Sequence, residues 1–214
     1  PGGGQRRAPG PAPDLGSAAR YRAPPHCSYA PGVIVLDLSK VSVGTNPPFE
    51  VNVVIEVPVG GAPVKYELDK DSGAIFVDRF LHTAMFYPCN YGFVPHTLSD
   101  DGDPVDVLVA GPQPVVPGAI VRARPIGVLM MNDEKGEDEK VLAVPADALH
   151  PYYSEIHSWR DLPRILIDQI SHFFQHYKDL EKDKWVKIKH WGEPGEAHKA
   201  IEQAIRRYEQ TKAD

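Results

Sequence analysis

The sequence has few cysteines, only two in 214 residues, Cys27 and Cys89. They do not form a Cys-x-x-Cys pair, so neither a disulfide framework nor a zinc or redox motif is expected, and a reducing cytoplasm is the predicted location. The chain also has no apolar run that approaches 18 residues. We therefore expect no transmembrane helix and no membrane partner.

Positive charge is also scarce. The chain has 29 acidic and 23 basic residues, a formal net charge of −6. Nucleic-acid binders usually carry a basic footprint, so no nucleic-acid partner is expected. Apolar residues make up 42% and charged residues 24%, near the average for soluble globular proteins, and the length suits one well-buried domain.

Residues 1–35 lack a periodic apolar pattern. They hold seven of the 22 prolines, six of the 18 glycines and four arginines, but a single acid, Asp14. Such a segment buries too little surface to repay its ordering entropy, so it is predicted to be a disordered extension. It lacks the apolar core of a secretory signal, and its prolines oppose the amphipathic helix of a transit peptide. A translated upstream or vector-derived segment fits at least as well, and the folded domain is placed at residues 36–214.

Apolar residues occupy every second position between Phe49 and Val57, the pattern of a half-buried strand. Further strand-like runs lie at Val64–Leu68, Ala74–Phe80, Val105–Ala110, Ile120–Arg124, Gly127–Met131, Lys140–Val144 and Trp185–Trp191. Two helices are predicted, one with an apolar stripe from Leu162 to Tyr177 and one near Gly195–Lys212. The pattern predicts a small antiparallel sheet or barrel with helices packed on its outside.

The common catalytic motifs are absent as well, including the Walker phosphate loop, Gly-x-Gly-x-x-Gly, Gly-x-Ser-x-Gly and His-Glu-x-x-His. The strongest local signal is an acidic run, Asp100-Asp101-Gly102-Asp103-Pro104-Val105-Asp106, which leads directly into an apolar strand. Four carboxylates this close repel one another, and hard oxygen ligands suit Mg²⁺, Mn²⁺ or Ca²⁺ better than zinc. A solvated acidic turn is the alternative interpretation.

A second acidic run, Asp133–Lys140, lies between two predicted strands. By itself it fits a charged hairpin loop better than a metal site. Together the two runs hold nine of the 29 acids within fifteen residues, so two strand ends could supply a multi-metal site.

Several cations and phenols accompany these acids. The candidates are Lys65, Glu67, Arg79, Tyr177, Lys178 and Lys184. Each alone fits a surface ion pair or a core residue, but carboxylate-held divalent ions together with Lys and Arg fit metal-assisted attack of water on a phosphate. His172 and His176 have the i, i+4 spacing of metal ligands, although without a nearby Glu signature they fit packing or subunit contacts better.

Longer stretches of the sequence then resemble one family. They are Val54–Glu56, Lys65–Lys70, Phe76–Arg79, Phe86–Gly92, Asp101–Leu108, Asp133–Lys140 and His176–Glu181. In this order, over about residues 45–190, they resemble the family I soluble inorganic pyrophosphatases, and the bacterial branch most closely. The segment Asp-Gly-Asp-Pro-Val-Asp-Val-Leu is highly specific for that family. Residues 1–35 are foreign to its short bacterial members.

The resemblance implies an α+β fold, an OB-like five-stranded antiparallel β-barrel with flanking α-helices. It also implies Mg²⁺-dependent hydrolysis of inorganic diphosphate to two orthophosphates, with several ions per site and Mn²⁺ or Zn²⁺ as possible substitutes. A metal-bridged water would attack phosphorus, with Asp103 as the general base. The bacterial members form homohexamers, and His172 and His176 match their subunit-contact helix.

The resemblance also assigns roles to individual residues. The implied metal ligands are Asp101, Asp106, Asp138, Asp133 and Glu67. The implied phosphate-binding residues are Lys65, Arg79, Tyr91, Tyr177, Lys178, Lys140 and Lys184, of which Lys65, Arg79 and Tyr91 would join Asp103 in catalysis. Glu56, Asp78 and Tyr87 would lie behind these groups or beside the substrate.

Two rival interpretations remain at this point. A non-enzymatic OB-fold module that binds oligonucleotide or another polyanion would combine a basic groove with exposed aromatic residues, whereas the loops here are acidic. A catalytically dead relative used for assembly would be expected to have lost at least one of the acids. Every position that the family uses for chemistry is matched, which favours the enzyme.

Overall fold

The protein is described here by a computed structural model that covers residues 36–212. The predicted disordered extension and Cys27 lie outside the described residues. The strands are β1 (Val51–Val57), β2 (Val64–Leu68), β3 (Ile75–Phe80), β4 (Asn90–Phe93), β5 (Asp106–Val109), β6 (Ile120–Asp133), β7 (Gly136–Pro145) and β8 (Val186–Gly192). The α-helices are α1 (Arg164–His176) and α2 (Pro194–Thr211), and short 3-10 helices span Leu38–Lys40, Pro151–Tyr153 and Trp159–Asp161.

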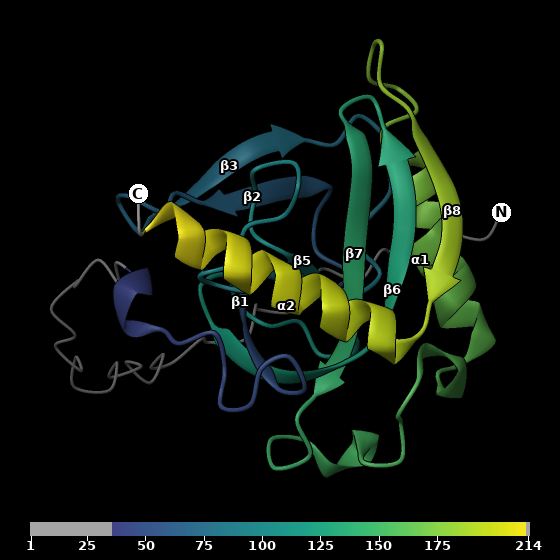
Figure 1. Ribbon diagram of the computed structural model, residues 1–214. Coiled ribbons are helices and arrows are strands. Elements are labelled where there is room, and N and C mark those ends of the chain that lie inside the picture. The colour runs from purple at the N-terminus through teal and green to yellow at the C-terminus, as the bar shows by residue number, and fades with distance from the viewer. Residues whose placement is uncertain (1–35, 213–214) are drawn as a thin grey trace, which may run out of the picture. The chain divides into compact units, whose positions relative to one another are not determined.

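Five strands close into a ring. Hydrogen bonds join them in the order β1-β4-β5-β7-β6, and β6 pairs back onto β1, while β8 adds to the free side of β6. This arrangement confirms the expected OB-like barrel with flanking helices. One pairing, β5 with β7, is parallel, whereas the sequence predicted an antiparallel sheet. The β2–β3 hairpin forms a separate two-stranded sheet (Figure 1).

The two helices cover different apolar layers. On β5 and β7, Leu108 and Leu142 pack into a cluster that includes Phe173 and Phe174 of α1. Their neighbours in sequence, such as Val107, pack instead into a cluster that includes α2. These strands are therefore buried on both faces, which explains their uninterrupted apolar sequences. Figure 1 shows α2 lying across the strands, with α1 on another side, next to β8.

The structure departs from the predicted strands in three main places. The runs at 120–124 and 127–131 belong to one long strand, β6, whose pairing with β7 shifts register between Pro125 and Gly127. The structure extends β7 back to Gly136, so the second acidic run forms a tight β6–β7 hairpin. Strand β4 was not predicted, because its four residues follow a turn-like Tyr-Pro-Cys sequence and show no alternation.

Candidate active site

Two adjoining cavities, of about 350 and 130 Å³, lie where the barrel strands, the β2–β3 hairpin and the end of α1 meet. The larger is lined by Glu56, Lys65, Glu67, Leu68, Lys70, Asp78, Arg79, Tyr91, Phe93, Asp103, Pro104, Asp106 and Lys135. The smaller shares six of these residues and adds Tyr87, Asp101, Asp133, Glu134, Glu137, Asp138, Lys140, Phe174, Tyr177, Lys178 and Lys184. All sixteen residues singled out from the sequence therefore line one continuous site.

The first acidic run forms a tight turn that enters β5. Gly102 has a φ of +90°, a left-handed backbone conformation that strains other residues, which explains the glycine between two aspartates. The Asp101 carboxylate accepts a hydrogen bond from the backbone N–H of Asp103 at 3.0 Å, and this bond orients its side chain. Asp103 remains exposed, with its carboxylate 3.8 Å from the Lys70 ammonium.

A buried lysine joins two of the predicted metal ligands. Asp106 and Lys140 are register partners on β5 and β7. The Lys140 ammonium donates hydrogen bonds to Asp106 at 2.5 Å and to Asp138 at 2.7 Å. Burial lowers the pKa of Lys140, but the two carboxylates outweigh it and hold the pKa well above its usual value. Burial raises the pKa of Asp138, and neighbouring Asp106 and Asp133 raise it further against the effect of Lys140.

A second buried ion pair links the β6–β7 hairpin to the segment after α1. The Lys178 ammonium donates to Asp133 at 2.8 Å and lies 3.4 Å from Glu134. Both Lys178 and Asp133 have side chains less than a tenth exposed. Burial favours the neutral acid, but the Lys178 ammonium and the Lys135 N–H lower the pKa of Asp133 below its usual value.

The β2–β3 hairpin brings two cations together. Lys65 and Arg79 are register partners. Lys65 forms a short ion pair with Glu67 and a longer one, 3.5 Å, with Asp78. Burial lowers the pKa of Lys65, but the hydrogen bond and charge of Glu67 raise it above its usual value, so the side chain stays charged. The strand pairing thus holds two positive charges at the cavity wall.

Three tyrosines form the apolar side of the site. Tyr87, Tyr91 and Tyr177 are each at most 6% exposed, and Tyr87 packs on Phe173 of α1 at 4.6 Å between ring centroids. Burial raises the pKa of all three phenols, so they remain protonated donors. All three line the smaller cavity, where their hydroxyl groups can donate hydrogen bonds.

Glu56 is a buried acid behind the cavity. Its carboxylate accepts a hydrogen bond from the N–H of Leu68 at 2.8 Å, which fixes β1 against β2. Burial raises the pKa of Glu56 to about 8, and the charge of Asp106 contributes to this rise. Glu56 is therefore largely protonated at neutral pH in the metal-free protein, which reduces the repulsion among the carboxylates.

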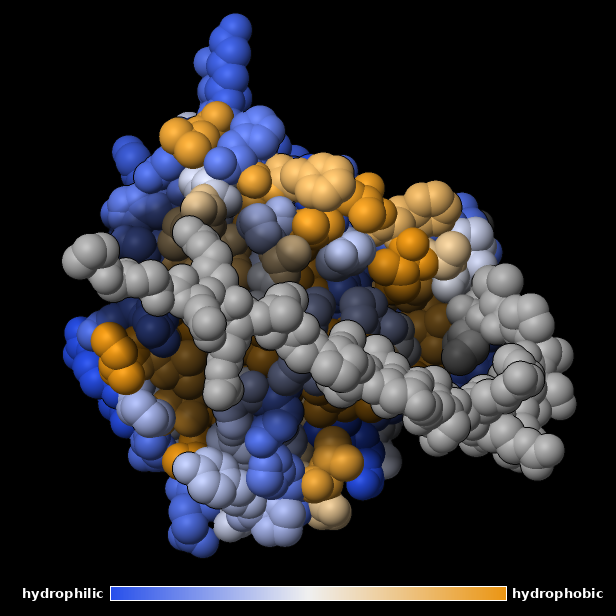
Figure 2. Space-filling view, turned by 180° about the vertical axis from the view of Figure 1, so that it is seen from behind, coloured by the Kyte–Doolittle hydropathy of each residue, from blue (hydrophilic) through white to orange (hydrophobic). Residues whose placement is uncertain are grey.

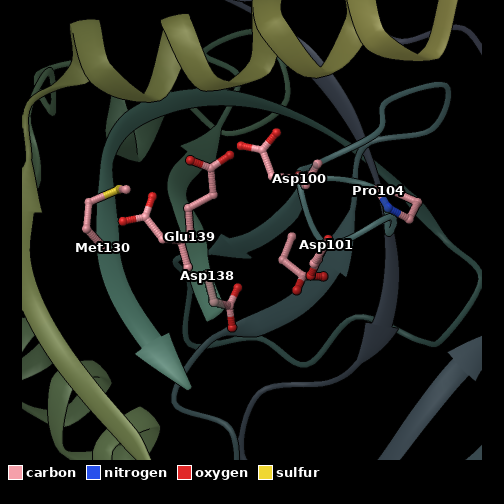
Figure 3. Close-up of a pocket in the computed structure, with 9 residues that line it drawn as sticks. Asp100, Asp101, Pro104, Met130, Asp138 and Glu139 are labelled. Carbon is pink, nitrogen blue, oxygen red and sulfur yellow. The ribbon is translucent and has the colours of Figure 1, made fainter. Parts of the chain in front are cut away.

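A third pocket, of about 40 Å³, lies next to the same acidic loop (Figure 3). In Figure 3 the side chains of Asp100 and Glu139 point toward each other. Arg207 of α2 lies 3.0 Å from the Asp100 carboxylate and donates to the backbone oxygen of Leu98 at 2.7 Å. This arginine therefore ties α2 to the loop that carries Asp101.

The sequence comparisons agree with this geometry. The profile of the inorganic pyrophosphatase family matches residues 53–209. The chain belongs to that family. A curated relative from Caulobacter vibrioides, named inorganic pyrophosphatase, is 66% identical over 176 residues, which cover 82% of this chain and 99% of the relative. A relative of the same name from Agrobacterium fabrum is 58% identical and covers 80% and 97%.

Solved structures of inorganic pyrophosphatases have the same fold. That from Thermus thermophilus is 44% identical, with a TM-score of 0.77 over 81% of this chain and 99% of that chain. A structure titled as the inorganic phosphatase of Anaplasma phagocytophilum is 57% identical, with a TM-score of 0.77 over 79% and 99%. Pyrophosphatases are metal-dependent enzymes that act on diphosphate.

The donor set of the cavity fits divalent metal ions. Asp101, Asp106 and Asp138 offer only oxygen atoms, the ligands preferred by Mg²⁺ and similar ions. The Lys140 ammonium already lies between two of these acids, where positive charge is required. Within residues 36–212, no three acidic, imidazole or thiolate groups stand close enough to enclose an ion as they are.

Several residues with a place at the site were not singled out from the sequence. Glu134, Lys135 and Glu137 line the smaller cavity. Glu134 and Glu137 belong to the second acidic run, which signalled the segment but not the individual side chains. Arg207 carried no signal, because it lies in no recognisable motif and its partner Asp100 is distant in sequence. Glu181 ends one of the stretches that resemble the family, but its contact with Arg79 is distant in sequence and could not be predicted.

Proposed function

We propose that the chain hydrolyses inorganic diphosphate to two orthophosphates with Mg²⁺, at the cavity between the barrel and the β2–β3 hairpin. The observation that carries this proposal is the convergence of carboxylates with Lys65, Arg79, Lys140, Lys178 and Lys184 on one site. A site for an anionic substrate alone would need only the cations. The excess of carboxylates fits an anion that arrives with divalent metal ions.

Metal ligation is assigned to Asp101, Asp106 and Asp138, with Asp133 and Glu67 joining when substrate binds. Bound Mg²⁺ would lower the pKa of a coordinated water and offset phosphate charge; Mn²⁺ or Zn²⁺ are possible substitutes. Asp103 is assigned as the general base. Its carboxylate is exposed to the cavity and has only a distant cation beside it, so it is free to accept a proton.

We assign the binding of the phosphate oxygens to the cations and phenols of the opposite wall. Lys65, Arg79 and Tyr91 lie at the boundary shared by both cavities, where they can contact the reacting phosphoryl group. Tyr177, Lys178, Lys140 and Lys184 line the smaller cavity and stabilise the leaving phosphate. Lys140 and Lys178 now have carboxylate partners, so substrate binding exchanges one anion for another at these two lysines.

The decisive experiment measures orthophosphate released from diphosphate by the purified chain, with Mg²⁺ and with excess chelator. We expect rapid release with Mg²⁺ and none with chelator. Asp106→Asn, which removes the most central carboxylate, should lose most of the activity. Diphosphate binding without turnover at saturating Mg²⁺ would instead identify a catalytically dead relative.

Self-association into a homohexamer, in the cytoplasm and without nucleic-acid partners, is part of the proposal. His172 is exposed on α1 and His176 is 40% exposed at its side chain, so both are available for subunit contacts. Phe76, Val77 and Phe80 on β3 are each more than half exposed. Figure 2 shows further apolar surface (orange) among the hydrophilic side chains of one face. Exposed apolar patches favour association, and sedimentation of the purified chain tests it.

Among the described residues, the structure has no helix able to cross a membrane.

A further inference from the structure

Glu181 is an acid with little exposed surface in the turn that follows α1. Its side chain is 9% exposed, and one carboxylate oxygen, Oε2, lies 3.0 Å from the Lys184 ammonium and 3.5 Å from the Arg79 guanidinium. The two cations come from segments about a hundred residues apart in sequence. Glu181 thus joins the β2–β3 hairpin to the turn that also carries Lys178.

Two polar atoms in this cluster make no hydrogen bond among the described residues, although the Nε of Arg79 lies 3.8 Å from the Asp78 carboxylate. The second carboxylate oxygen of Glu181, Oε1, and the Nε of Arg79 are both buried and make no hydrogen bond within the described part of the chain. Buried polar atoms without partners carry a free-energy cost and call for an explanation. Arg79 lines both cavities and Lys184 lines the smaller one, so the cluster lies directly behind the predicted phosphate site.

Electrostatics explains why an acid is needed here. Two cations held close together repel each other unless an anion lies between them, and the repulsion is strongest where water is excluded. Glu181 supplies that anion. It does not line either described cavity, so it acts on a substrate only through its two partners.

We propose that Glu181 is a positioning residue for phosphate binding, which holds Arg79 and Lys184 together so that both face the same phosphoryl group. This inference rests on the proposed function. It predicts a loss of substrate affinity when the carboxylate is removed. An acid that merely competed with phosphate for the two cations would have the opposite effect, because its removal would free them.

The test compares the wild-type chain with Glu181→Gln, which keeps the shape of the side chain and removes its charge. With saturating Mg²⁺, we expect the KM for diphosphate to rise about tenfold while kcat changes less than about threefold. Calorimetry with imidodiphosphate, a non-hydrolysable analogue, should show a similar loss of affinity in the Mg²⁺-loaded protein. Mn²⁺ binding to the substrate-free protein should be unchanged.

Two further variants control the comparison. Glu202→Gln removes a half-exposed acid that pairs with Arg206 on α2, remote from the site, and should leave every value unchanged. Glu181→Asp keeps the charge on a shorter side chain and should recover part of the affinity. It also provides the readout if the Gln variant does not fold.

The outcomes separate the explanations. A lower or unchanged KM in Glu181→Gln would overturn the positioning role, and a matching loss of Mn²⁺ affinity would show that Glu181 acts through the metal ligands instead. A wild-type chain that releases no orthophosphate from diphosphate would refute the proposed function itself, whatever the variants do.

Discussion

Asp106 and Lys140 face each other across the one parallel strand pair of the barrel, and their side chains meet at 2.5 Å. The lysine also bonds Asp138, and only 7% of its side chain is exposed. A cation of the chain itself therefore already neutralises part of the carboxylate cluster. In the metal-free protein, the Lys140 ammonium thus offsets part of the negative charge of Asp106 and Asp138. Bound metal ions would offset more of it.

Replacing Lys140 by Met should make the metal-free protein less stable but responsive to Mg²⁺. Removal of one partner from a buried ion pair costs about 3–5 kcal/mol, because the remaining charges lie uncompensated. Divalent ions can replace the missing charge, so Mg²⁺ should raise the melting temperature of the variant more than that of the wild type. Turnover should stay low in either case, since the variant lacks a proposed phosphate-binding group.

Scanning calorimetry with chelator and with Mg²⁺ checks this prediction. Lys189→Met provides a matched control, because Lys189 also pairs with an acid of the β6–β7 hairpin, Glu137, but in an exposed position. The control should show little change under either condition. Equal responses of wild type and Lys140→Met to Mg²⁺ would contradict the idea that lysine and metal share the compensation.

Glu56 should make the stability of the metal-free protein depend on pH. Its pKa is raised from about 4.5 to about 8 by burial, so the folded state binds a proton that the unfolded chain releases. The resulting stabilisation is complete below about pH 4.5 and is lost as the pH rises to about 8. Glu56→Gln stays neutral throughout and can still accept the hydrogen bond from Leu68.

The free energy of unfolding of Glu56→Gln should therefore fall less than that of the wild type between pH 5 and pH 9, by on the order of 3 kcal/mol. Urea unfolding in the presence of chelator measures it at both values. Glu50→Gln, a substitution of another acid near β1, should follow the wild type. If Glu56→Gln and the wild type lose stability in parallel, Glu56 is ionised in the folded state.

Asp103→Asn should separate catalysis from metal binding. Asp103 is 65% exposed at its side chain, and its backbone N–H, not its carboxylate, holds Asp101 in place. The amide cannot accept the proton of the attacking water, so kcat should fall by about 10²–10⁴-fold. Mn²⁺ affinity, measured by equilibrium dialysis, should stay within about twofold of the wild type. A collapse of Mn²⁺ affinity would make Asp103 chiefly a metal ligand.

The period-two pattern of β1 and the apolar stripe of α1 predicted the positions of two core elements. The predicted half-burial of β1 was wrong, because Val54 and Glu56 on its second face are buried as well. The parallel pairing of β5 with β7 could not be predicted in this way, because burial on both faces removes the alternation and strand order depends on contacts distant in sequence. Strand β4 could not be predicted from the sequence either. Its Gly92 allows β1 to approach so closely that a Cβ would lie 1.9 Å from the Val54 oxygen, a constraint that only the folded chain reveals.

The residues of the site likewise include some that the sequence predicted and some that it did not. Its acids were apparent because Asp101, Asp103 and Asp106 are adjacent in sequence, and the resemblance to a family identified the others. Contacts between residues distant in sequence left no local pattern. Glu181 contacts Arg79 from about a hundred residues along the chain, and Arg207 contacts Asp100 from the last helix.

Arg207→Met should weaken metal binding, although it removes a positive charge near the acids. Charge alone would predict tighter binding, since a nearby cation repels Mg²⁺. However, Arg207 holds the loop by the backbone oxygen of Leu98 and by Asp100, next to the proposed metal ligand Asp101. Loss of these contacts should disorder the loop and lower the Mn²⁺ affinity about three- to tenfold. Arg206→Met is the matched control, because Arg206 is 73% exposed and contacts only Glu202 of its own helix among the ion pairs of the described residues. Calorimetric titration of both variants with Mn²⁺ shows whether the affinity falls or rises. Tighter binding in Arg207→Met would mean that Arg207 affects metal binding only through its charge.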